Sequence, residues 1–237
     1  MKKFINFIIS IIFPRTCSSC GKTLPFSSGK NICDRCLKNI PKLEGLICNK
    51  CSLPLPDGGA ICSDCKSNKD IYFEVLKSPY TYSTQMKKLI KKLKYSRRDF
   101  LSQDLAVELA KFIIKENIDK NIDAVVPVPM HWFKKWKRGY NQAELLAKGV
   151  AQIINKPMYN ALIRTKYTKP QFNLKKQERQ KNLERMFDLN KKYVDVIRNK
   201  RILLIDDIAT TCSTTNQCAK VLKTLKIKTV VVTLARA

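Results

Sequence analysis

The stretch RILLIDDIATTCSTT, residues 201–215, decides the fold of this chain. Its first half is an apolar run of strand character that ends in two adjacent carboxylates, Asp206 and Asp207. Its second half is rich in small hydroxyl residues and leads into a helical pattern from Thr215 to about Leu225. Backbone amides at such a helix start bind phosphate. Because two acids before the loop can hold a sugar diol or a hydrated Mg²⁺, the stretch predicts a site for a phosphorylated ribose.

This stretch resembles the phosphoribosyl-pyrophosphate (PRPP) motif of type I phosphoribosyltransferases, in which two acids precede Thr-Thr-Gly-Ser/Thr-Thr. The resemblance implies that Asp206 and Asp207 are the catalytic residues and bind the ribose hydroxyls. The PRPP-binding set that it implies is Asp206, Asp207, Ala209, Thr210, Thr211, Cys212, Ser213 and Thr214. The chain departs from the motif at Cys212, where the family usually has glycine. A Cβ at a left-handed position costs about 1–2 kcal/mol, which bears on phosphate affinity but not on the fold.

A blander interpretation of the same stretch is a buried strand followed by an ordinary capped helix. The two adjacent acids beside four hydroxyls favour the phosphate site over this alternative.

The composition sets broad limits on the fold and on the partners. A chain of 237 residues with 44% apolar residues can form one large domain or two smaller ones with a real core. The net charge of +27 points to polyanions or to an acidic membrane surface as partners. A lysine-rich proteome would produce the same excess without any selected binding surface.

The N-terminal segment is apolar from Phe4 to Phe13 and follows Lys2 and Lys3. No small-residue cleavage site follows it, so we expect a short amphipathic or docking helix rather than a signal peptide. No segment approaches the length of about 20 apolar residues that a membrane span needs. The expected location is the cytoplasm, with peripheral contact at the inner face of the cytoplasmic membrane as a further option.

Eight of the ten cysteines form four Cys-x-x-Cys pairs before residue 66, separated by twelve, eleven and ten residues. Each pair puts two thiolates on one side of a tight turn, and two turns complete a tetrahedral shell of sulfurs. Soft thiolates select Zn²⁺ over Mg²⁺ or Ca²⁺. The predicted metal ligands are Cys17, Cys20, Cys33, Cys36, Cys48, Cys51, Cys62 and Cys65.

The simplest arrangement joins the first two pairs around one zinc and the last two around another, as in a double zinc ribbon. A cross-brace, a single zinc, an iron–sulfur cluster and a disulfide framework are the alternatives, and the disulfides would need an oxidising compartment. Structural zinc can contribute on the order of 10 kcal/mol to the folding of such a short polar segment. Cys212 and Cys218 are not expected to be ligands.

Strand-like and helical patterns alternate between residues 71 and 154, as expected for an α/β fold. Residues 71–82 are strand-like, 85–95 predict a basic helix, 100–116 an amphipathic helix, 122–128 a buried strand and 141–154 a helix. A stiff Pro-Val-Pro turn and a run of basic residues lie between the last two elements. The lysines of the 85–95 helix form either a solvated face or a track for a polyanion. His131, the only histidine, is expected to make hydrogen bonds in the turn rather than to act as a catalytic base.

Further motifs occur in a fixed order along the second half of the chain. They are Val126-Pro-Val-Pro129, Arg138-Gly-Tyr-Asn141-Gln-Ala-Glu144, Arg164-Thr165, Thr168-x-Pro170-Gln171, Glu178-Arg179 and Asn182. Together with the cysteine pairs and the PRPP motif, they resemble the ComF competence-protein family over nearly the whole chain. The resemblance implies a zinc-binding N-terminal region, a phosphoribosyltransferase-like domain and a role in natural transformation, the uptake of external DNA.

In phosphoribosyltransferases a flexible loop closes over PRPP, and residues 164–187 correspond to it in this resemblance. Cations from this loop and from the turn after the 122–128 strand would face the pyrophosphate group if the turn folds back onto the strand ends. The candidates for this role are Lys134, Lys137, Arg138, Arg164, Gln171 and Arg179. A solvated charged loop is the alternative.

The expected fold is α/β, a type I phosphoribosyltransferase-like parallel sheet flanked by helices and preceded by a small zinc-ribbon module. The expected divisions are a short apolar helix over residues 1–14, a double zinc-ribbon module over 15–68 and a phosphoribosyltransferase-like domain over 69–237.

The first functional hypothesis is a DNA-uptake protein that holds PRPP or another phosphoribosyl ligand, with Mg²⁺, and handles single-stranded DNA beside other uptake proteins. Aromatic residues among lysines would permit base stacking, namely Tyr72, Phe73, Tyr80, Tyr82, Tyr95, Trp132, Trp136 and Tyr140. The alternative is an active Mg²⁺-dependent phosphoribosyltransferase, although the sequence specifies no acceptor. A third hypothesis is an adaptor with a vestigial nucleotide site.

Overall fold

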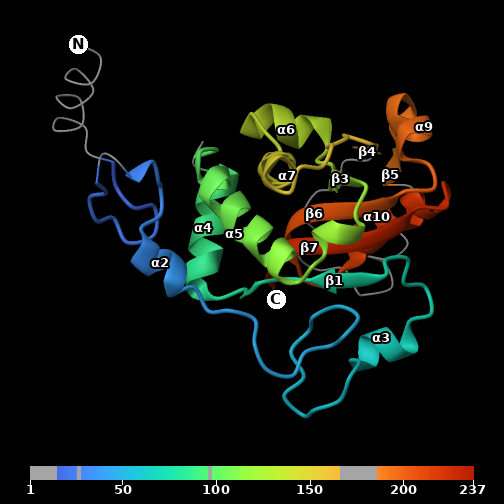
Figure 1. The fold of residues 1–237 in the computed structure, drawn as a ribbon, viewed down its shortest axis with the longest axis horizontal. Coiled ribbons are helices and arrows are strands. Elements are labelled where there is room, and N and C mark those ends of the chain that lie inside the picture. Colours follow the sequence, from blue (N-terminus) through green and yellow to red (C-terminus); the bar gives the residue numbers. More distant parts are fainter. Residues whose placement is uncertain (1–14, 26–27, 96–97, 166–185) are drawn as a thin grey trace.

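The computed structural model describes residues 15–25, 28–95, 98–165 and 186–237. Its main sheet has five strands in the order β1-β7-β6-β3, with β2 pairing farther along β7. All of these pairings are parallel, which confirms the expected α/β architecture (Figure 1). The strands are β1 (Val75–Lys77), β2 (Tyr80–Thr81), β3 (Ala124–Pro127), β6 (Arg201–Ala209) and β7 (Lys228–Arg236).

Helices cover both faces of this sheet, which explains the continuous apolar runs of its strands. Alternate side chains of β6 enter different layers, because successive residues of a strand point to opposite faces. Leu203 and Ile205 pack with the helices of one face, whereas Ile202 and Leu204 pack with the helix of the other. The first face carries α4 (Thr84–Tyr95), α5 (Leu101–Lys115) and α7 (Gln142–Ile153), and the second carries α10 (Ser213–Lys223).

The two helices α5 and α7 pack closely against each other. A Cβ added at Gly149 of α7 would lie 2.6 Å from the Cβ of Ala106 in α5, so only glycine fits at this crossing. The close contact fixes α7 over the β3 and β6 strands and thereby holds the end of β3 in place.

Smaller elements surround the sheet. A two-stranded antiparallel sheet pairs β4 (Leu162–Arg164) with β5 (Phe187–Leu189), and the chain between them includes residues 166–185. The expected N-terminal helix, Gln171 and Arg179 lie outside the described residues. The other elements are α2 (Asp34–Lys38), α3 (Ser63–Ser67), η2 (Asp119–Asn121), α6 (Trp132–Arg138), η3 (Lys191–Tyr193) and α9 (Val194–Ile197).

The helices over residues 85–95, 100–116 and 141–154 are confirmed to within one residue at each end. The basic run after the Pro-Val-Pro turn is a helix, α6, and not the loop that the sequence suggested. His131 caps its start by accepting a hydrogen bond from the Phe133 amide at 3.2 Å, and Gly139 ends it in a left-handed conformation at φ +90°. Helix α10 begins at Ser213, two residues earlier than expected.

Both cysteine segments pack onto the helical layers of the sheet. Cys17, Ile32 and Ile40 share a hydrophobic cluster with α4 and α5, and Cys48 and Cys62 share the other cluster with β1 and α10. Among the described residues there is no helix long and apolar enough to cross a membrane.

Candidate functional site

The first four-cysteine centre consists of Cys17, Cys20, Cys33 and Cys36, whose Sγ atoms all lie within 4.8 Å of one another. The Sγ atoms of Cys20 and Cys33 are 4.0 Å apart. Four sulfurs at about 2.3 Å from a tetrahedral zinc lie about 3.8 Å from one another, so this arrangement fits a zinc ion.

The second centre repeats the first. Cys48, Cys51, Cys62 and Cys65 also lie within 4.8 Å of one another, and the Sγ atoms of Cys51 and Cys62 are 3.7 Å apart. In both centres the amide of the third cysteine donates to the first sulfur at 3.3 Å, and a short helix follows the third cysteine. The first pair therefore joins the second and the third joins the fourth, as in a double ribbon and not a cross-brace.

All ten cysteines are free thiols, and each centre contains one thiol with a lowered pKa, Cys17 and Cys51, whereas burial raises the pKa of Cys36, Cys62 and Cys65. Burial raises the pKa of Cys17, but backbone N–H groups of Cys33, Cys20 and Ser19 outweigh it and lower that pKa to about 6. A hydrogen bond from the Cys212 thiol is the main cause that lowers the pKa of Cys51 to about 4. Thiolates are the form that binds zinc, so both centres suit structural metal ions.

The two neighbouring acids lie at the carboxyl end of β6, where the sequence motif predicted them. Asp206 is 9% exposed and Asp207 is 4% exposed. The Asp207 amide donates to Oδ1 of Asp206 at 2.8 Å. Burial, and secondarily the charge of Asp207, raises the pKa of Asp206 well above its usual range. The pair is thus an electrostatically costly arrangement, which is typical of functional sites.

The end of β3 lies beside these acids. Pro127 pairs with Ile205 in register, and the amide of Val128 donates to the Ile205 carbonyl at 2.9 Å. Because both strands are parallel, the Pro-Val-Pro turn and the acids share one edge of the sheet, which is the usual ligand crevice of such folds.

Lys94 at the last turn of α4 forms an ion pair with Asp207. Its neighbour Lys92 donates from Nζ to the Ser18 carbonyl at 2.6 Å. The lysines of α4 are therefore not one solvated face or one continuous track, because at least these two bind other parts of the chain. Lys94 supplies the positive charge that Asp207 needs at its buried position.

The hydroxyl-rich loop joins β6 to α10. Cys212 is left-handed, with φ +57° and ψ 5°, which is the conformation for which glycine would be the natural choice. The Oγ atoms of Thr211 and Ser213 are 2.8 Å apart, and Thr215 Oγ1 donates to the Cys212 carbonyl at 2.9 Å. The first amides of α10 have no partner within the helix, so this end can bind an anion.

Arg236 at the end of β7 connects this loop to the second cysteine centre. It is 5% exposed and donates from Nε to the Cys51 carbonyl at 2.9 Å. Its Nη1 donates to the carbonyl of Ala209 at 3.1 Å and also to the carbonyl of Thr210. A hollow of about 200 Å³ lies between the two parts, with Cys65 and Asn68 on one side and Thr211, Ser213 and Asn216 on the other.

On the pyrophosphate side, the structure brings together Arg164 and Lys134. Burial lowers the pKa of Arg164, and electrostatic interactions with Cys218 and Asp206 act against this decrease. Burial also lowers the pKa of Lys134, and Arg164 and Arg138 lower it further. These two cations therefore share a partly buried space on the side of Asp206.

The other two predicted cations of α6 lie in a different environment. Arg138 donates from Nη1 to Gln142 Oε1 at 2.5 Å, and its guanidinium lies 5.1 Å from the centre of the Tyr95 ring. Lys137 lines a shallow hollow beside Trp136. Because the basic run is helical and not a loop that folds back, its cations point in several directions.

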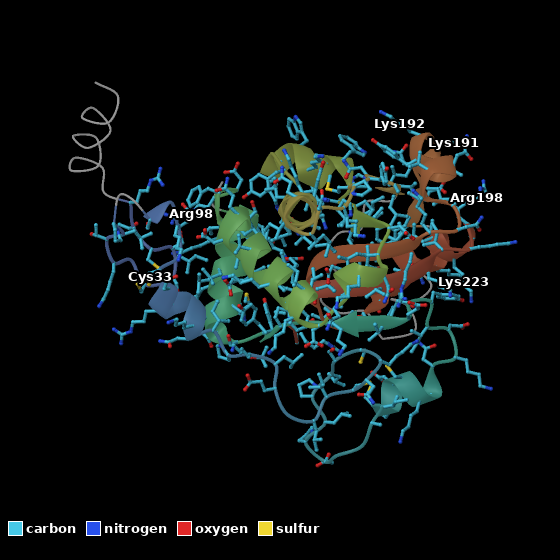
Figure 2. The ribbon with its side chains drawn as sticks, viewed as in Figure 1. Cys33, Arg98, Lys191, Lys192, Arg198 and Lys223 are labelled. Carbon is cyan, nitrogen blue, oxygen red and sulfur yellow. The ribbon has the colours of Figure 1, made fainter. Side chains whose placement is uncertain are left out.

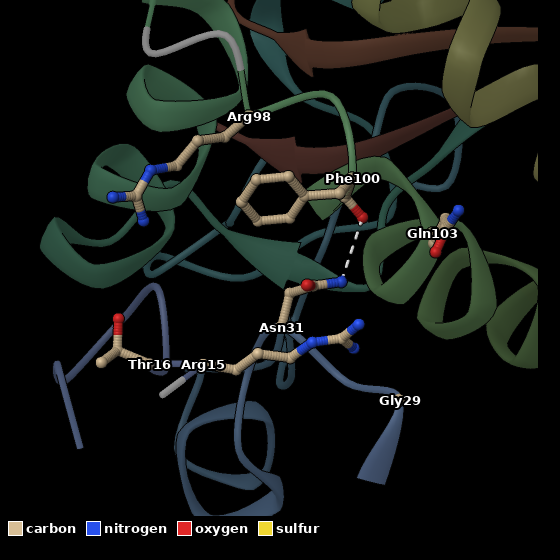
Figure 3. A pocket seen from close by; sticks show the side chains of 7 residues that line it. All are labelled: Arg15, Thr16, Gly29, Asn31, Arg98, Phe100 and Gln103. Carbon is tan, nitrogen blue, oxygen red and sulfur yellow. Dashed lines mark hydrogen bonds between the residues drawn. The ribbon is translucent and has the colours of Figure 1, made fainter. Parts of the chain in front are cut away.

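Basic side chains also gather away from this edge. Figure 2 shows Lys191, Lys192 and Arg198 around η3 and α9, with Lys223 of α10 on the same side of the molecule. A further open hollow has a volume of about 610 Å³. Arg15, Arg98 and the Phe100 ring are among the side chains that line it (Figure 3). The positive charge is therefore spread over several surfaces.

Lys94 and Arg236 are site residues that the sequence motifs did not predict. Lys94 follows Ile90 by four residues, so the helical period places it at the border of the apolar face. The buried part of β7 consists of residues 229–236, and Arg236 is its one charged residue. A charged side chain in a buried strand needs a partner. The position of Arg236 in this otherwise uncharged stretch was therefore the sequence feature that could have identified it.

Comparisons with known proteins agree with this geometry. The sequence profile of the double zinc ribbon domain matches residues 8–66. Competence protein F of Haemophilus influenzae is 28% identical over 246 residues, which cover 100% of both chains. Competence protein ComFC of Bacillus subtilis is 28% identical over 202 residues, 81% of this chain and 78% of the relative. The DNA utilization protein YhgH of Escherichia coli is 26% identical over 214 residues, 88% of this chain and 91% of the relative.

Among solved structures, a hypoxanthine phosphoribosyltransferase from Staphylococcus aureus is similar to this chain with 17% identity and a TM-score of 0.38. The match covers 59% of this chain and 64% of that enzyme. The α/β architecture itself follows from the strand order and register of the chain.

Proposed function

We propose that this chain, whose likeness to the ComF competence proteins extends over its whole length, binds PRPP with Mg²⁺ and handles single-stranded DNA during DNA uptake. The resemblance to that family, which the motifs indicated, is confirmed by the relatives described above. The likeness supports a role in competence or DNA utilization, and the ligand and the form of the DNA are our proposal.

One observation carries the ligand assignment. Two buried acids, a helix start with hydroxyls and the turn after β3 meet at one edge of a parallel sheet. A phosphorylated ribose has a phosphate at one end and a diol at the other, and these three features match it.

Different residues would bind different parts of the ligand. Asp206 and Asp207 accept hydrogen bonds from the ribose hydroxyls, and the amides and hydroxyls of the loop from Thr210 to Thr214 hold the 5′-phosphate. Lys94 must release Asp207 or stay beside it as the ligand enters, because both contact the same carboxylate. Arg164 and Lys134 provide positive charge for the pyrophosphate. Bound Mg²⁺ would neutralise part of that charge.

The zinc ions have a structural role in this proposal. Both centres have four thiol ligands, a closed shell that leaves no position for a substrate. Free thiols that serve as metal ligands suit a reducing compartment, so we place the protein at the cytoplasmic side of DNA uptake. The same proposal includes the domain boundaries expected at residues 14 and 68, with the zinc ribbons packed against the helices that cover the sheet.

Turnover as a phosphoribosyltransferase is the second candidate function. It is favoured by the position of Arg164, whose charge interacts with Asp206 across the site. Mg²⁺-dependent release of pyrophosphate from PRPP, in the presence of candidate bases or amines, would support it. Equal release by wild type and by the Asp206→Asn/Asp207→Asn variant would exclude it.

Thermal unfolding in the presence of ligands tests the binding proposal. A ligand that binds only the folded state raises the free energy of unfolding by RT ln(1 + [L]/Kd) and thereby raises the unfolding temperature. We expect PRPP with Mg²⁺ to raise it more than pyrophosphate or ribose 5-phosphate does at the same concentration. The double Asn variant should lose this increase, and an unchanged increase in that variant would contradict the proposed site.

A further inference from the structure

Both tryptophans of the chain are exposed on one short helix. Trp132 is 69% exposed and Trp136 is 77% exposed, and both belong to α6. Phe133 of the same helix and Tyr95 at the end of α4 are exposed as well. By contrast, Phe73 and Tyr80, which the sequence placed in the same aromatic set, are buried in the core. Isolated exposed rings are ordinary, but several large rings together mark an interaction site.

The exposed rings are held in a fixed arrangement. The rings of Phe133 and Trp136 are stacked, with centroids 6.2 Å apart and an interplanar angle of 29°. Trp132 meets Phe133 edge to face at 5.9 Å. The helix is capped at both ends, by His131 and by Gly139, so it is rigid for its length. A flat ligand can therefore bind to rings that are already positioned.

Cations accompany these rings. The Arg138 guanidinium lies over Tyr95, and a hollow of about 250 Å³ beside Trp136 is lined by Lys137, Arg138 and Tyr140. Asp99 is the acidic residue among its lining residues. Lys135 is already paired with Glu144 at 2.7 Å. Lys137 lines the hollow beside Trp136, so it is the lysine of α6 that we choose as the phosphate contact.

This surface adjoins the phosphoribosyl site. Helix α6 follows the turn after β3, which lies beside the acids, and Tyr95 directly follows Lys94, the partner of Asp207. A strand bound across α6 would thus pass the carboxyl edge of the sheet.

We infer that α6, with Tyr95 from α4, is a stacking surface for single-stranded nucleic acid, in which bases stack on Trp132 and Trp136 and Lys137 contacts a phosphate. The inference rests on the proposed handling of single-stranded DNA and gives it a location. Planar rings beside guanidinium and ammonium groups match alternating bases and phosphates. An anionic membrane would also attract these cations, but its binding would not require the ordered contacts among the rings of α6.

Intrinsic fluorescence tests this surface directly, because both tryptophans of the chain lie on it. Titration with a thymidine 20-mer should quench the tryptophan fluorescence of the zinc-loaded protein, since stacked bases quench indole emission. Binding of the same labelled 20-mer is followed in parallel by fluorescence anisotropy. Binding without quenching would overturn the inference, although the proposed DNA handling would stand.

Variants separate stacking from charge. Trp132→Ala/Trp136→Ala should weaken DNA binding by about tenfold for each ring, with no change in the salt dependence. Trp132→Phe/Trp136→Phe should recover most of the loss. Lys137→Ala should reduce the slope of log affinity against log salt by about 0.7, the value for one phosphate contact on a single strand.

Matched controls come from other surfaces. Phe100→Ala removes an exposed ring that lies away from the α6 cluster (Figure 3), and Lys191→Ala/Lys192→Ala removes charge at η3 (Figure 2). We expect Phe100→Ala to leave DNA affinity unchanged and the lysine variant to change it less than the tryptophan variant. Full affinity in Trp132→Ala/Trp136→Ala, or quenching by phosphatidylglycerol vesicles and not by DNA, would overturn the inference. No DNA binding by wild type would contradict the DNA handling itself, and the PRPP assay would remain a separate test.

Discussion

Arg236 at the end of β7 donates a hydrogen bond to the carbonyl of Cys51, a ligand residue of the second cysteine centre, at 2.9 Å. The same guanidinium binds the carbonyls of Ala209 and Thr210, where the loop proposed to bind phosphate begins. One buried cation therefore holds a metal-binding turn and the proposed ligand loop together. The first cysteine centre has no such role among the described contacts, because it packs on α4 and α5.

Replacement of Arg236 should be costly. Arg236→Ala leaves the carbonyls of Cys51 and Thr210 without their donor, while the Ala209 carbonyl keeps the hydrogen bond from the Ala237 amide, and a buried group left unpaired costs about 1–3 kcal/mol. We expect a loss of about 3 kcal/mol or more in urea-induced unfolding. Arg198→Ala is the control, because its ion pair with Asp195 is long and exposed, and it should change stability by less than about 0.5 kcal/mol. A cost for Arg236→Ala no larger than that of the control would contradict this role.

The two zinc centres should affect the ligand loop differently. Cys20→Ser and Cys51→Ser should each reduce bound zinc from two ions per chain towards one, because each removes one of four ligands. Only Cys51→Ser should increase hydrogen exchange of the amides at residues 209–214, because only the second centre contacts Arg236. Zinc content by elemental analysis and exchange by mass spectrometry are the measurements. Equal hydrogen exchange at residues 209–214 in both variants would contradict a link to this loop that only the second centre has.

The pH dependence of stability should reveal the strain at Asp206. Burial, and secondarily the charge of Asp207, raises the pKa of Asp206 in the folded state. The folded state then holds this proton more tightly than the unfolded chain does, so wild type loses stability as pH rises from about 3.9 through the raised folded pKa. Asp206→Asn cannot ionise and avoids this loss.

Relative to wild type, Asp206→Asn should therefore gain stability progressively as the pH rises from about 3.9 through the raised folded-state pKa of Asp206, while losing PRPP binding. The comparison of the two proteins at each pH cancels the effect of pH on zinc binding, which is common to both. Thermal unfolding without PRPP is the measurement. A stability difference that stays constant or shrinks as pH rises would contradict the assignment.

The left-handed residue in the loop offers a test by substitution. Cys212→Gly removes a Cβ from a position at φ +57°, which relieves about 1–2 kcal/mol of strain but adds backbone freedom to the unfolded chain worth about 0.4–1 kcal/mol. We expect a net change in stability below about 1.5 kcal/mol and a higher affinity for PRPP, because the backbone can approach the phosphate more closely.

Cys212→Ala is the matched control, since it removes the thiol and keeps the Cβ. It should leave the PRPP affinity close to that of wild type. If both variants bind PRPP equally tightly, the thiol and not the backbone conformation limits the affinity.

The sequence was sufficient where the chemistry depends on spacing. The Cys-x-x-Cys pairs predicted two sulfur shells, and the apolar run before Asp206 predicted a buried strand with acids at its carboxyl end. The left-handed conformation of Cys212 was also anticipated, because its neighbours match a motif in which glycine holds that position.

The sequence was insufficient where partners come from distant parts of the chain. Lys94 reaches Asp207 only because α4 ends beside β6, and Arg236 reaches Cys51 only because a cysteine segment packs onto the end of β7. The helix α6 was missed because it is only seven residues long, too short for the spacing of its three aromatic residues to stand out against the basic run. Its formation depends on the two caps, His131 and Gly139, and its tryptophans remain exposed.

Isothermal titration calorimetry with PRPP and Mg²⁺ is the most direct measurement of whether the edge beside Asp206 and Asp207 binds a phosphoribosyl ligand. We predict saturable binding with one site per chain in the wild type, dependence on Mg²⁺, and loss of the heat signal in Asp206→Asn/Asp207→Asn with both zinc ions retained. No heat of binding in the wild type, or an unchanged isotherm in the double variant, would contradict it.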